Sequence, residues 1–370
     1  MSETLQARER VLAAPPAEAV LDGRIYERIM TAAQFAEPDQ VPIWDFVDSW
    51  PVYQHLAPGE TDPVVATAKV FHGLGIDLCR GVYMPQPPEA EGREWHHETH
   101  STKISGRTHW IVEYPIRSLE AIRAWEGGVP AKDDFWPEVE RDRQIRDTFA
   151  PRTLYVPGGG VGFHGAYGTM GLQLFSTALY DARDDVVRII DTMNRQSCAR
   201  AEAYAEAKLG PFFFIGDDIA FKGRTMFSLP MLRELFFPYL TRLCEPLVAA
   251  GIQVIFHTDG YIMEIVDDLL ESGVTGLNPL EPLAGNDIAA LKRRYGRNLI
   301  LVGGIDCSQL LPFGSVAEVR AGVRHLLHDA GHGGGLFIGS SSEIVPATPV
   351  ENILGFYEAC HELGRYPLPE

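Results

Sequence analysis

The strongest chemical signal in the sequence is a histidine and an aspartate two residues apart. His257 and Asp259 directly follow an apolar run, so one strand presents an imidazole and a carboxylate, on one face if the chain stays extended. Both groups are ligands for a borderline divalent cation, and Asp217, Asp218 or Glu343 could complete a site with one open position. The alternative is that His257 acts as a proton donor or binds substrate, while Asp259 caps the next helix.

The elements that must position these residues alternate between strand and helix. Segments with helical periodicity separate short β-rich segments at 41–46, 77–83, 153–156, 212–215, 253–256, 276–278, 299–302 and 335–338. This alternation implies parallel pairing, and eight units favour a closed (β/α)8 barrel of TIM type over an open doubly wound sheet. The first and last segments should then be parallel neighbours that close the sheet.

The chain organisation follows from the same pattern. We expect an N-terminal helical extension over residues 1–40 and a single barrel domain over 41–370. After strand two, residues 84–151 form an insertion, in which an alternating stretch from Trp95 to Tyr114, broken at Ser105-Gly106, predicts a β-hairpin followed by short helices.

If the chain is a barrel, chemistry belongs at the C-terminal ends of its strands. The catalytic candidates are His257, Asp217 and Asp218. The candidates for substrate binding are Trp44, Asp45, Asp48, Arg80, Tyr83, Phe163, Tyr167, Asn278 and Glu281. Trp44, Trp50, Phe163 and Tyr167 are candidates for an aromatic wall around the substrate, with core packing as the alternative. Residues 160–165 match G-x-G-x-x-G but follow the third strand, which favours a loop with positive φ over a nucleotide site.

Composition narrows the choice of partners. Fifty acidic against 32 basic residues give a formal net charge of −18, a field that repels nucleic acid and anionic membranes. No apolar stretch approaches the roughly 20 residues of a membrane span. The five cysteines contain no CxxC pair, which indicates reduced thiols. We therefore expect a soluble cytoplasmic protein that binds a small molecule.

Several further segments make the chain recognisable. They are Gly216-Asp217-Asp218 with Met226, Ser228 and Pro238, then 257–260, 276–279 with Glu281, 292–296, 303–306 and 348–352. In this order they resemble the uroporphyrinogen decarboxylase (URO-D) superfamily, in the branch that contains cobalamin-dependent methyltransferases. The resemblance implies a (β/α)8 barrel and is compatible with a homodimer.

One departure from the family pattern argues against the family's name-giving reaction. True uroporphyrinogen decarboxylases carry an arginine-rich segment after the first strand, whereas residues 44–50 here read WDFVDSW. We expect Asp45 and Asp48 to face the mouth and to repel a multiply anionic porphyrinogen. The stretch 341–346 also lacks the histidine that those enzymes have before their last helix. Uroporphyrinogen decarboxylation is therefore not expected.

A second departure concerns the metal. The zinc methyltransferases of this superfamily bind zinc through a His-x-Cys pair after the fifth strand and a cysteine after the eighth. The corresponding residues here are His257, Asp259 and either Ser342 or Glu343. Oxygen in place of sulfur makes the bound metal a stronger Lewis acid, which suits a methyl ether or alcohol better than a thiol.

The resemblance thus implies the substrate-activating subunit of a corrinoid-dependent O-demethylase. Zinc or another divalent metal at His257, Asp259 and Glu343 would polarise the ether oxygen of a small methoxylated substrate, and a partner corrinoid protein would supply cob(I)alamin as the methyl acceptor. Two alternatives stay open. One is a metal-free decarboxylase or lyase, with His257 as proton donor and Arg80 or Lys222 as anchor for a small carboxylate. The other is a non-catalytic ligand-binding barrel.

Overall fold

The computed structural model describes residues 20–96, 101–105 and 108–368. Its parallel strands follow the predicted order around a ring. Six of them pair in the order β14-β13-β12-β11-β8-β7, and three pair in the order β1-β2-β6. Their bounds are Trp44–Asp45 (β1), Leu78–Cys79 (β2), Leu154–Tyr155 (β6), Gly158–Gly159 (β7), Phe212–Gly216 (β8), Gln253–His257 (β11), Gly276–Asn278 (β12), Ile300–Ile305 (β13) and Leu336–Ser340 (β14).

The two sheets are parts of one closed barrel. Strands β6 and β7 are halves of a single segment interrupted at Pro157, and they pair with β2 on one side and β8 on the other. At the seam, a parallel bridge joins Ile43 to Ile338, and the Ile338 N–H donates to Pro42 O at 2.9 Å. The barrel and the predicted pairing of its first and last strands are therefore confirmed.

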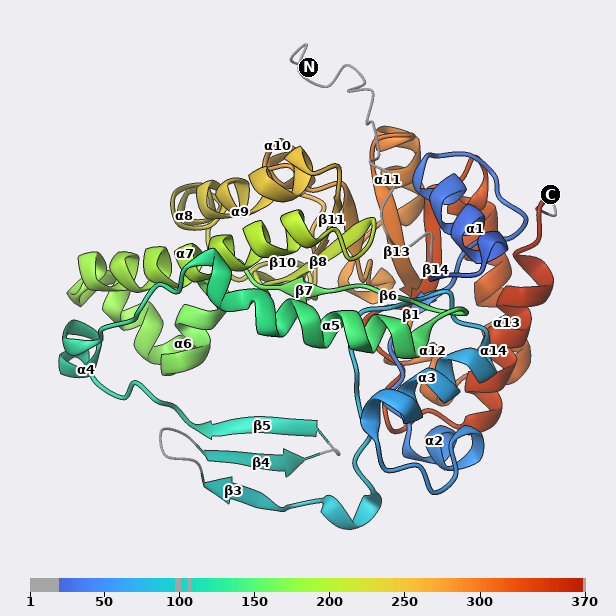
Figure 1. Ribbon diagram of the computed structural model, residues 1–370, viewed down its shortest axis with the longest axis horizontal. Helices are drawn as coiled ribbons and strands as arrows, with labels where there is room; N and C mark the ends of the chain where they lie inside the picture. Colours follow the sequence, from blue (N-terminus) through green and yellow to red (C-terminus); the bar gives the residue numbers. More distant parts are fainter. Residues whose placement is uncertain (1–19, 97–100, 106–107, 369–370) are drawn as a thin grey trace.

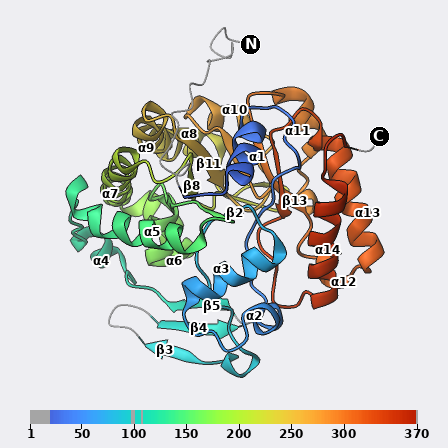
Figure 2. The same cartoon turned by 45° about the vertical axis from the view of Figure 1, so that its right-hand side comes forward.

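The strand residues alternate between two hydrophobic clusters, as the two-residue period of a strand requires. One cluster fills the barrel and includes Trp44, Leu78, Phe214 and Ile255, and it is closed at the N-terminal end by α1 (Gly23–Ala33). The residues in between, such as Cys79, pack outward against the helices. Figures 1 and 2 show these helices surrounding the strands.

The helical layer contains most of the described chain outside the barrel strands. Local signals set several of its boundaries: the Asp62 side chain accepts the Val64 and Val65 N–H groups at the start of α3, and Ser315 and Glu318 form a capping box on α13. The remaining helices are α2 (Trp50–Leu56), α3 (Pro63–Leu74), α4 (Leu119–Ala124), α5 (Trp136–Phe149), α6 (Phe163–Asp181), α7 (Arg183–Ala207), α8 (Leu229–Leu235), α9 (Phe237–Ala249), α10 (Val266–Glu271), α11 (Ile288–Tyr295), α12 (Leu310–Phe313), α13 (Val316–Leu326) and α14 (Val350–Leu363). Within the described residues, no helix is long and apolar enough to cross a membrane.

The insertion after β2 forms a small antiparallel sheet of its own. Strands β3 (Glu94–His96), β4 (Ser101–Ser105) and β5 (Thr108–Glu113) pair in that order. Figure 1 shows them at the bottom of the view, apart from the barrel strands. The predicted hairpin corresponds to β4 and β5, and β3 extends it by a third strand; Gly106 lies outside the described residues. A second short hairpin, β9 (Ala220–Phe221) with β10 (Arg224–Thr225), follows β8.

Candidate functional site

The inward-facing positions of two strands, β2 and β11, are followed by polar side chains. In β2 and β11, the inward residues Leu78 and Ile255 are followed two residues later by Arg80 and His257. Both of these side chains lie on the ring of Phe214 from β8: the Arg80 Cζ atom is 5.1 Å from its centroid, and the His257 ring centroid is 5.3 Å away. The apolar barrel interior is therefore capped at its C-terminal end by a polar layer.

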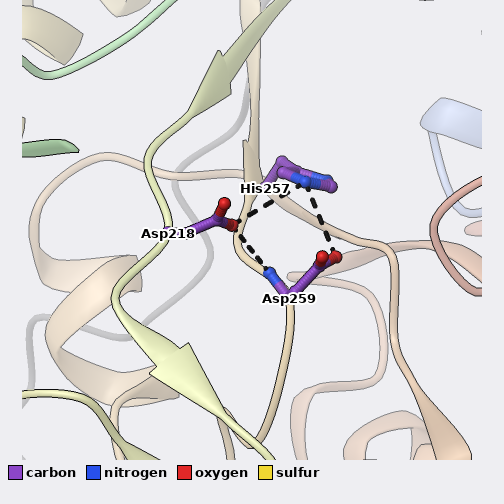
Figure 3. Close-up of side chains that lie close together, drawn as sticks. All are labelled: Asp218, His257 and Asp259. Carbon is purple, nitrogen blue, oxygen red and sulfur yellow. Dashed lines mark hydrogen bonds and ion pairs between the residues drawn. The ribbon is translucent and has the colours of Figure 1, made fainter. Parts of the chain in front are cut away.

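A histidine and two aspartates form the centre of this layer, as Figure 3 shows. Asp218, His257 and Asp259 each offer a ligand atom within 4.8 Å of the others. The His257 Nε2 atom is 4.0 Å from Asp218 Oδ1 and 3.7 Å from Asp259 Oδ1. The Asp259 N–H donates to Asp218 Oδ1 at 3.1 Å, and this hydrogen bond orients the Asp218 carboxylate.

The protonation of His257 suits it to act as a ligand. Its Nδ1 atom lies 2.7 Å from Asn278 Oδ1 on the neighbouring strand β12. Burial and the nearby charge of Arg80 lower the pKa of His257 to about 4, so the imidazole is neutral at neutral pH. A neutral ring that donates from Nδ1 turns the Nε2 lone pair toward the two carboxylates.

Two carboxyl groups near His257, those of Asp259 and Glu281, have pKa values that burial raises. Asp259 Oδ1 is buried and accepts no hydrogen bond from the described residues, and burial and the charge of Asp218 raise the pKa of Asp259. Glu281 Oε1 accepts the Gly260 N–H at 2.9 Å, and burial raises the pKa of Glu281 to about 7. A divalent cation is the partner that such an imidazole and such oxygens fit.

Asp217 points the other way, although it is adjacent to Asp218. Its carboxylate is 1% exposed and accepts the N–H groups of Val161 at 2.8 Å, Gly162 at 3.1 Å and His164 at 2.5 Å. It therefore fixes the glycine loop to the start of α6. The positive φ expected in this loop occurs at Gly162, with φ 106°, where a Cβ atom would come within 2.8 Å of Asn194 N.

Arg80 and Glu343 lie together at the mouth. The Arg80 Nη2 atom donates to Ser342 O at 3.1 Å and is 3.6 Å from Glu343 Oε2. Glu343, a predicted metal ligand, is not in the Asp218, His257 and Asp259 group, and its carboxylate accepts the Ser342 hydroxyl at 3.1 Å. The structure thus places Glu343 beside the cation of Arg80.

Asp45, the last residue of β1, and Asp48, three residues later, are both buried. The Asp45 carboxylate lies inside the wall instead of facing the mouth, because Trp44 takes the inward position and Asp45 the next, outward one. It is 4% exposed and accepts the Ser340 N–H and hydroxyl at 3.1 and 2.6 Å and the Tyr357 hydroxyl at 2.9 Å. Asp48 is also buried, and its Oδ2 accepts the hydroxyl of Tyr83, the other candidate of this region, at 3.4 Å.

Two of the four candidate wall aromatics, Trp44 and Phe163, are core residues, whereas Trp50 is half-buried at the start of α2. Trp44 is 1% exposed and packs edge-on against Phe212 at 5.5 Å inside the barrel. Phe163 is 0% exposed and lies among rings of the helical layer, with Phe227 at 5.0 Å. Tyr167 is nearer the site, since its hydroxyl donates to Asp218 O at 2.7 Å.

His164 was not among the candidates from the sequence, although it lies beside Asp218. Its Nδ1 atom accepts the Asp218 N–H at 3.4 Å and is 3.7 Å from Asp218 Oδ2, while its ring stacks on Tyr167 at 4.6 Å. The signal was present inside the glycine motif, where the histidine opens a helix directly after the loop.

A closed (β/α)8 barrel with a histidine and carboxylates at its C-terminal face defines an enzyme-like class of protein. A family model described as uroporphyrinogen decarboxylase (URO-D) matches residues 165–363 of the 370, and the chain therefore belongs to this family. No curated protein matches the sequence.

Two solved structures resemble the chain. A methyltransferase from Methanosarcina mazei aligns with a TM-score of 0.69 and 21% identity over 91% of this chain and 98% of that one, and so shares the fold. A B12-independent methionine synthase from a Shewanella species aligns with a TM-score of 0.48 and 13% identity over 87% of this chain and 96% of that one.

Proposed function

We propose that the protein is a metal-dependent methyltransferase that moves a methyl group from a small methoxylated molecule to a corrinoid carried by a partner protein. The observation that carries the proposal is the set of three ligand atoms from Asp218, His257 and Asp259 within 4.8 Å. In this proposal Asp218 takes the place that the sequence assigned to Glu343, because only Asp218 lies within the group. The fold shared with a methyltransferase supports the same class.

The chain's own residues have defined parts in this reaction. Asn278 holds the Nδ1 proton of His257, so that Nε2 stays free for the cation. When bound, a cation such as zinc would polarise the ether oxygen as its bond to the methyl carbon breaks. A reduced corrinoid on the partner would accept the methyl group, and water would supply the proton that the released oxygen takes. Phe214 packs beneath Arg80 and His257 and supports both side chains.

The test is the variant His257→Ala, assayed for zinc content, melting temperature and methyl transfer from a methoxylated substrate to free cob(I)alamin. We expect loss of bound zinc and of turnover with a folded protein, because one of three protein ligands is removed. His328→Ala, at a side chain that is 67% exposed, is the control that should change neither quantity. Retention of both zinc and full turnover in His257→Ala would refute the proposal.

A metal-free decarboxylase or lyase is the second candidate, favoured by the buried cation of Arg80 beside a neutral His257. Full activity after exhaustive chelation, with loss of activity in His257→Ala, would select it. We do not propose uroporphyrinogen as substrate, because residues 44–50 contain no arginine that could bind its carboxylates. Incubation with uroporphyrinogen should give no coproporphyrinogen at enzymatic rates.

A further inference from the structure

Arg80 is bonded differently from other partly buried arginines of the chain. Arg28, whose side chain is also 16% exposed, donates to both oxygens of Asp39 and to Asp77, each at 2.8 Å. The Arg80 side chain is equally buried, yet among the described residues it donates a single hydrogen bond, to Ser342 O. Its nearest carboxylate, Glu343, is 3.6 Å away, which is too far for a hydrogen bond.

Two aromatic rings pack against the Arg80 guanidinium, and among the described residues only Ser342 O accepts a hydrogen bond from it. Its Cζ atom lies 4.9 Å from the Phe46 ring centroid and 5.1 Å from that of Phe214. Ser342, which accepts its one hydrogen bond, has φ 137°, a conformation that costs energy outside glycine and that clusters at functional sites. A fixed planar fork with free donors is the arrangement that recognises a carboxylate.

Arg80 and His257, a member of the Asp218, His257 and Asp259 cluster, lie against the same buried aromatic ring. The Phe214 ring has the Arg80 Cζ atom at 5.1 Å and the His257 ring at 5.3 Å. Phe214 is itself buried, so Arg80 and His257 cover its ring at neighbouring positions. A small molecule above these two side chains can reach the guanidinium with one end and the Nε2 atom of His257 with the other. Among the described residues, Glu343, with its side chain 38% exposed, is the carboxylate nearest to Arg80, and Asp259 and Asp45 also act on its charge. An incoming anion must therefore displace or move Glu343.

We propose that Arg80 forms an anion subsite, so that the substrate is a small molecule with a carboxylate at one end. This rests on the proposed function only for the statement that the other end carries the methyl group. Glu343 acts in this proposal as an internal stand-in for the substrate carboxylate. It occupies the subsite loosely, at 3.6 Å, and yields it when substrate enters.

The probes are benzoate and benzamide, which match in size and differ in charge, together with the smaller pair acetate and acetamide. Binding to the metal-free protein is measured by calorimetry, so that a failure of methyl transfer does not affect the result. We expect the protein to prefer at least one carboxylate over its amide by about tenfold, as a charge-assisted bidentate pair would give. Arg80→Gln should abolish that preference, and Arg80→Lys should restore part of it.

Glu343→Gln is the decisive second variant, because it removes the competing carboxylate and should tighten carboxylate binding several-fold. It also keeps the test valid if Arg80→Gln does not fold. Arg233→Gln, which breaks an exposed pair with Asp268, is the matched control and should bind like the unmodified protein. The proposal would be overturned if no carboxylate bound at 10 mM or if acid and amide bound equally. It would also be overturned if the preference survived in Arg80→Gln or if binding were weaker in Glu343→Gln. Carboxylate preference without any methyl transfer would sustain the subsite and refute the proposed function.

Discussion

Replacement of Asp45 by asparagine tests whether this carboxylate binds substrate or closes the barrel. Its Oδ1 accepts from Phe46 N at 2.8 Å and from the Ser340 hydroxyl, and its Oδ2 from Ser340 N and the Tyr357 hydroxyl. In Asp45→Asn an amide N–H₂ replaces one oxygen. The Tyr357 hydroxyl can rotate to accept from it, but the Ser340 N–H is left without an acceptor, at a cost of about 1–3 kcal/mol.

The cost depends on pH, because burial raises the pKa of Asp45 from 3.8 to about 6. A folded-state pKa above the unfolded value means that proton uptake favours the folded state. This contribution is fully present below pH 3.8 and is lost as the pH rises through about 6. Between pH 8 and pH 5 it grows by about 1 kcal/mol, and asparagine lacks it. Asp45→Asn should therefore be more destabilising at pH 5 than at pH 8 by about that amount.

The assay is urea unfolding of both proteins at pH 5, 6.5 and 8, with activity per folded molecule measured in parallel. Asp39→Asn is the control. The hydrogen bond from Arg28 lowers the pKa of Asp39, whereas the pKa of Asp45 is raised, so Asp39 stays ionised throughout this range. Its effect should not change between pH 5 and pH 8. A pH-independent effect of Asp45→Asn, or loss of activity with unchanged stability, would show that the assignment of Asp45 to the wall is mistaken.

Three further predictions follow from single contacts. Asn278→Ala removes the acceptor for His257 Nδ1 and should weaken zinc binding by about 10- to 100-fold in a competition assay with a chelating dye; a change below twofold would contradict the assigned tautomer. Gly339→Ala places a Cβ against the carbonyl of Trp44 at the barrel seam and should destabilise the fold by about 1–3 kcal/mol or more in urea unfolding. Phe163→Ala should cost about 3–5 kcal/mol of stability and leave the KM of the folded enzyme unchanged, whereas a raised KM would return Phe163 to the substrate wall.

The barrel could be predicted from the sequence because its signal repeats. Each short β-rich segment is followed by helical periodicity, so an error in one segment does not alter the count. The exact strands are shorter, since β1 and β2 contain two residues each where the sequence predicted six or seven. A strand ends where its hydrogen bonds to the neighbouring strand end. Its exact length therefore depends on that neighbour and cannot be read from one segment alone.

The orientations of the site's side chains were harder to predict. A shift of one residue along a strand moves each side chain to the other face of the barrel wall. Phe212 and Phe214 face inward, so Asp218 does too, while Asp217 faces the helices and fixes α6. The same alternation sends Asp45 outward after the inward Trp44. Sequence alone places all of these acids near strand ends but does not tell which aromatic residue sets the phase.

Register between strands then decides which acid can join His257. Strand β11 pairs with β8 so that His257 lies opposite Gly216, and Asp218 follows two residues later on the same inward face. Glu343 follows β14, which is separated from β11 by β12 and β13. With strands about 4.8 Å apart, an acid on the adjacent strand reaches Nε2 of His257 directly, whereas one three strands away lies across the mouth, where it meets Arg80. The metal site that we propose would therefore take its second carboxylate from Asp218, which follows the strand next to His257, and not from Glu343, which follows the eighth strand.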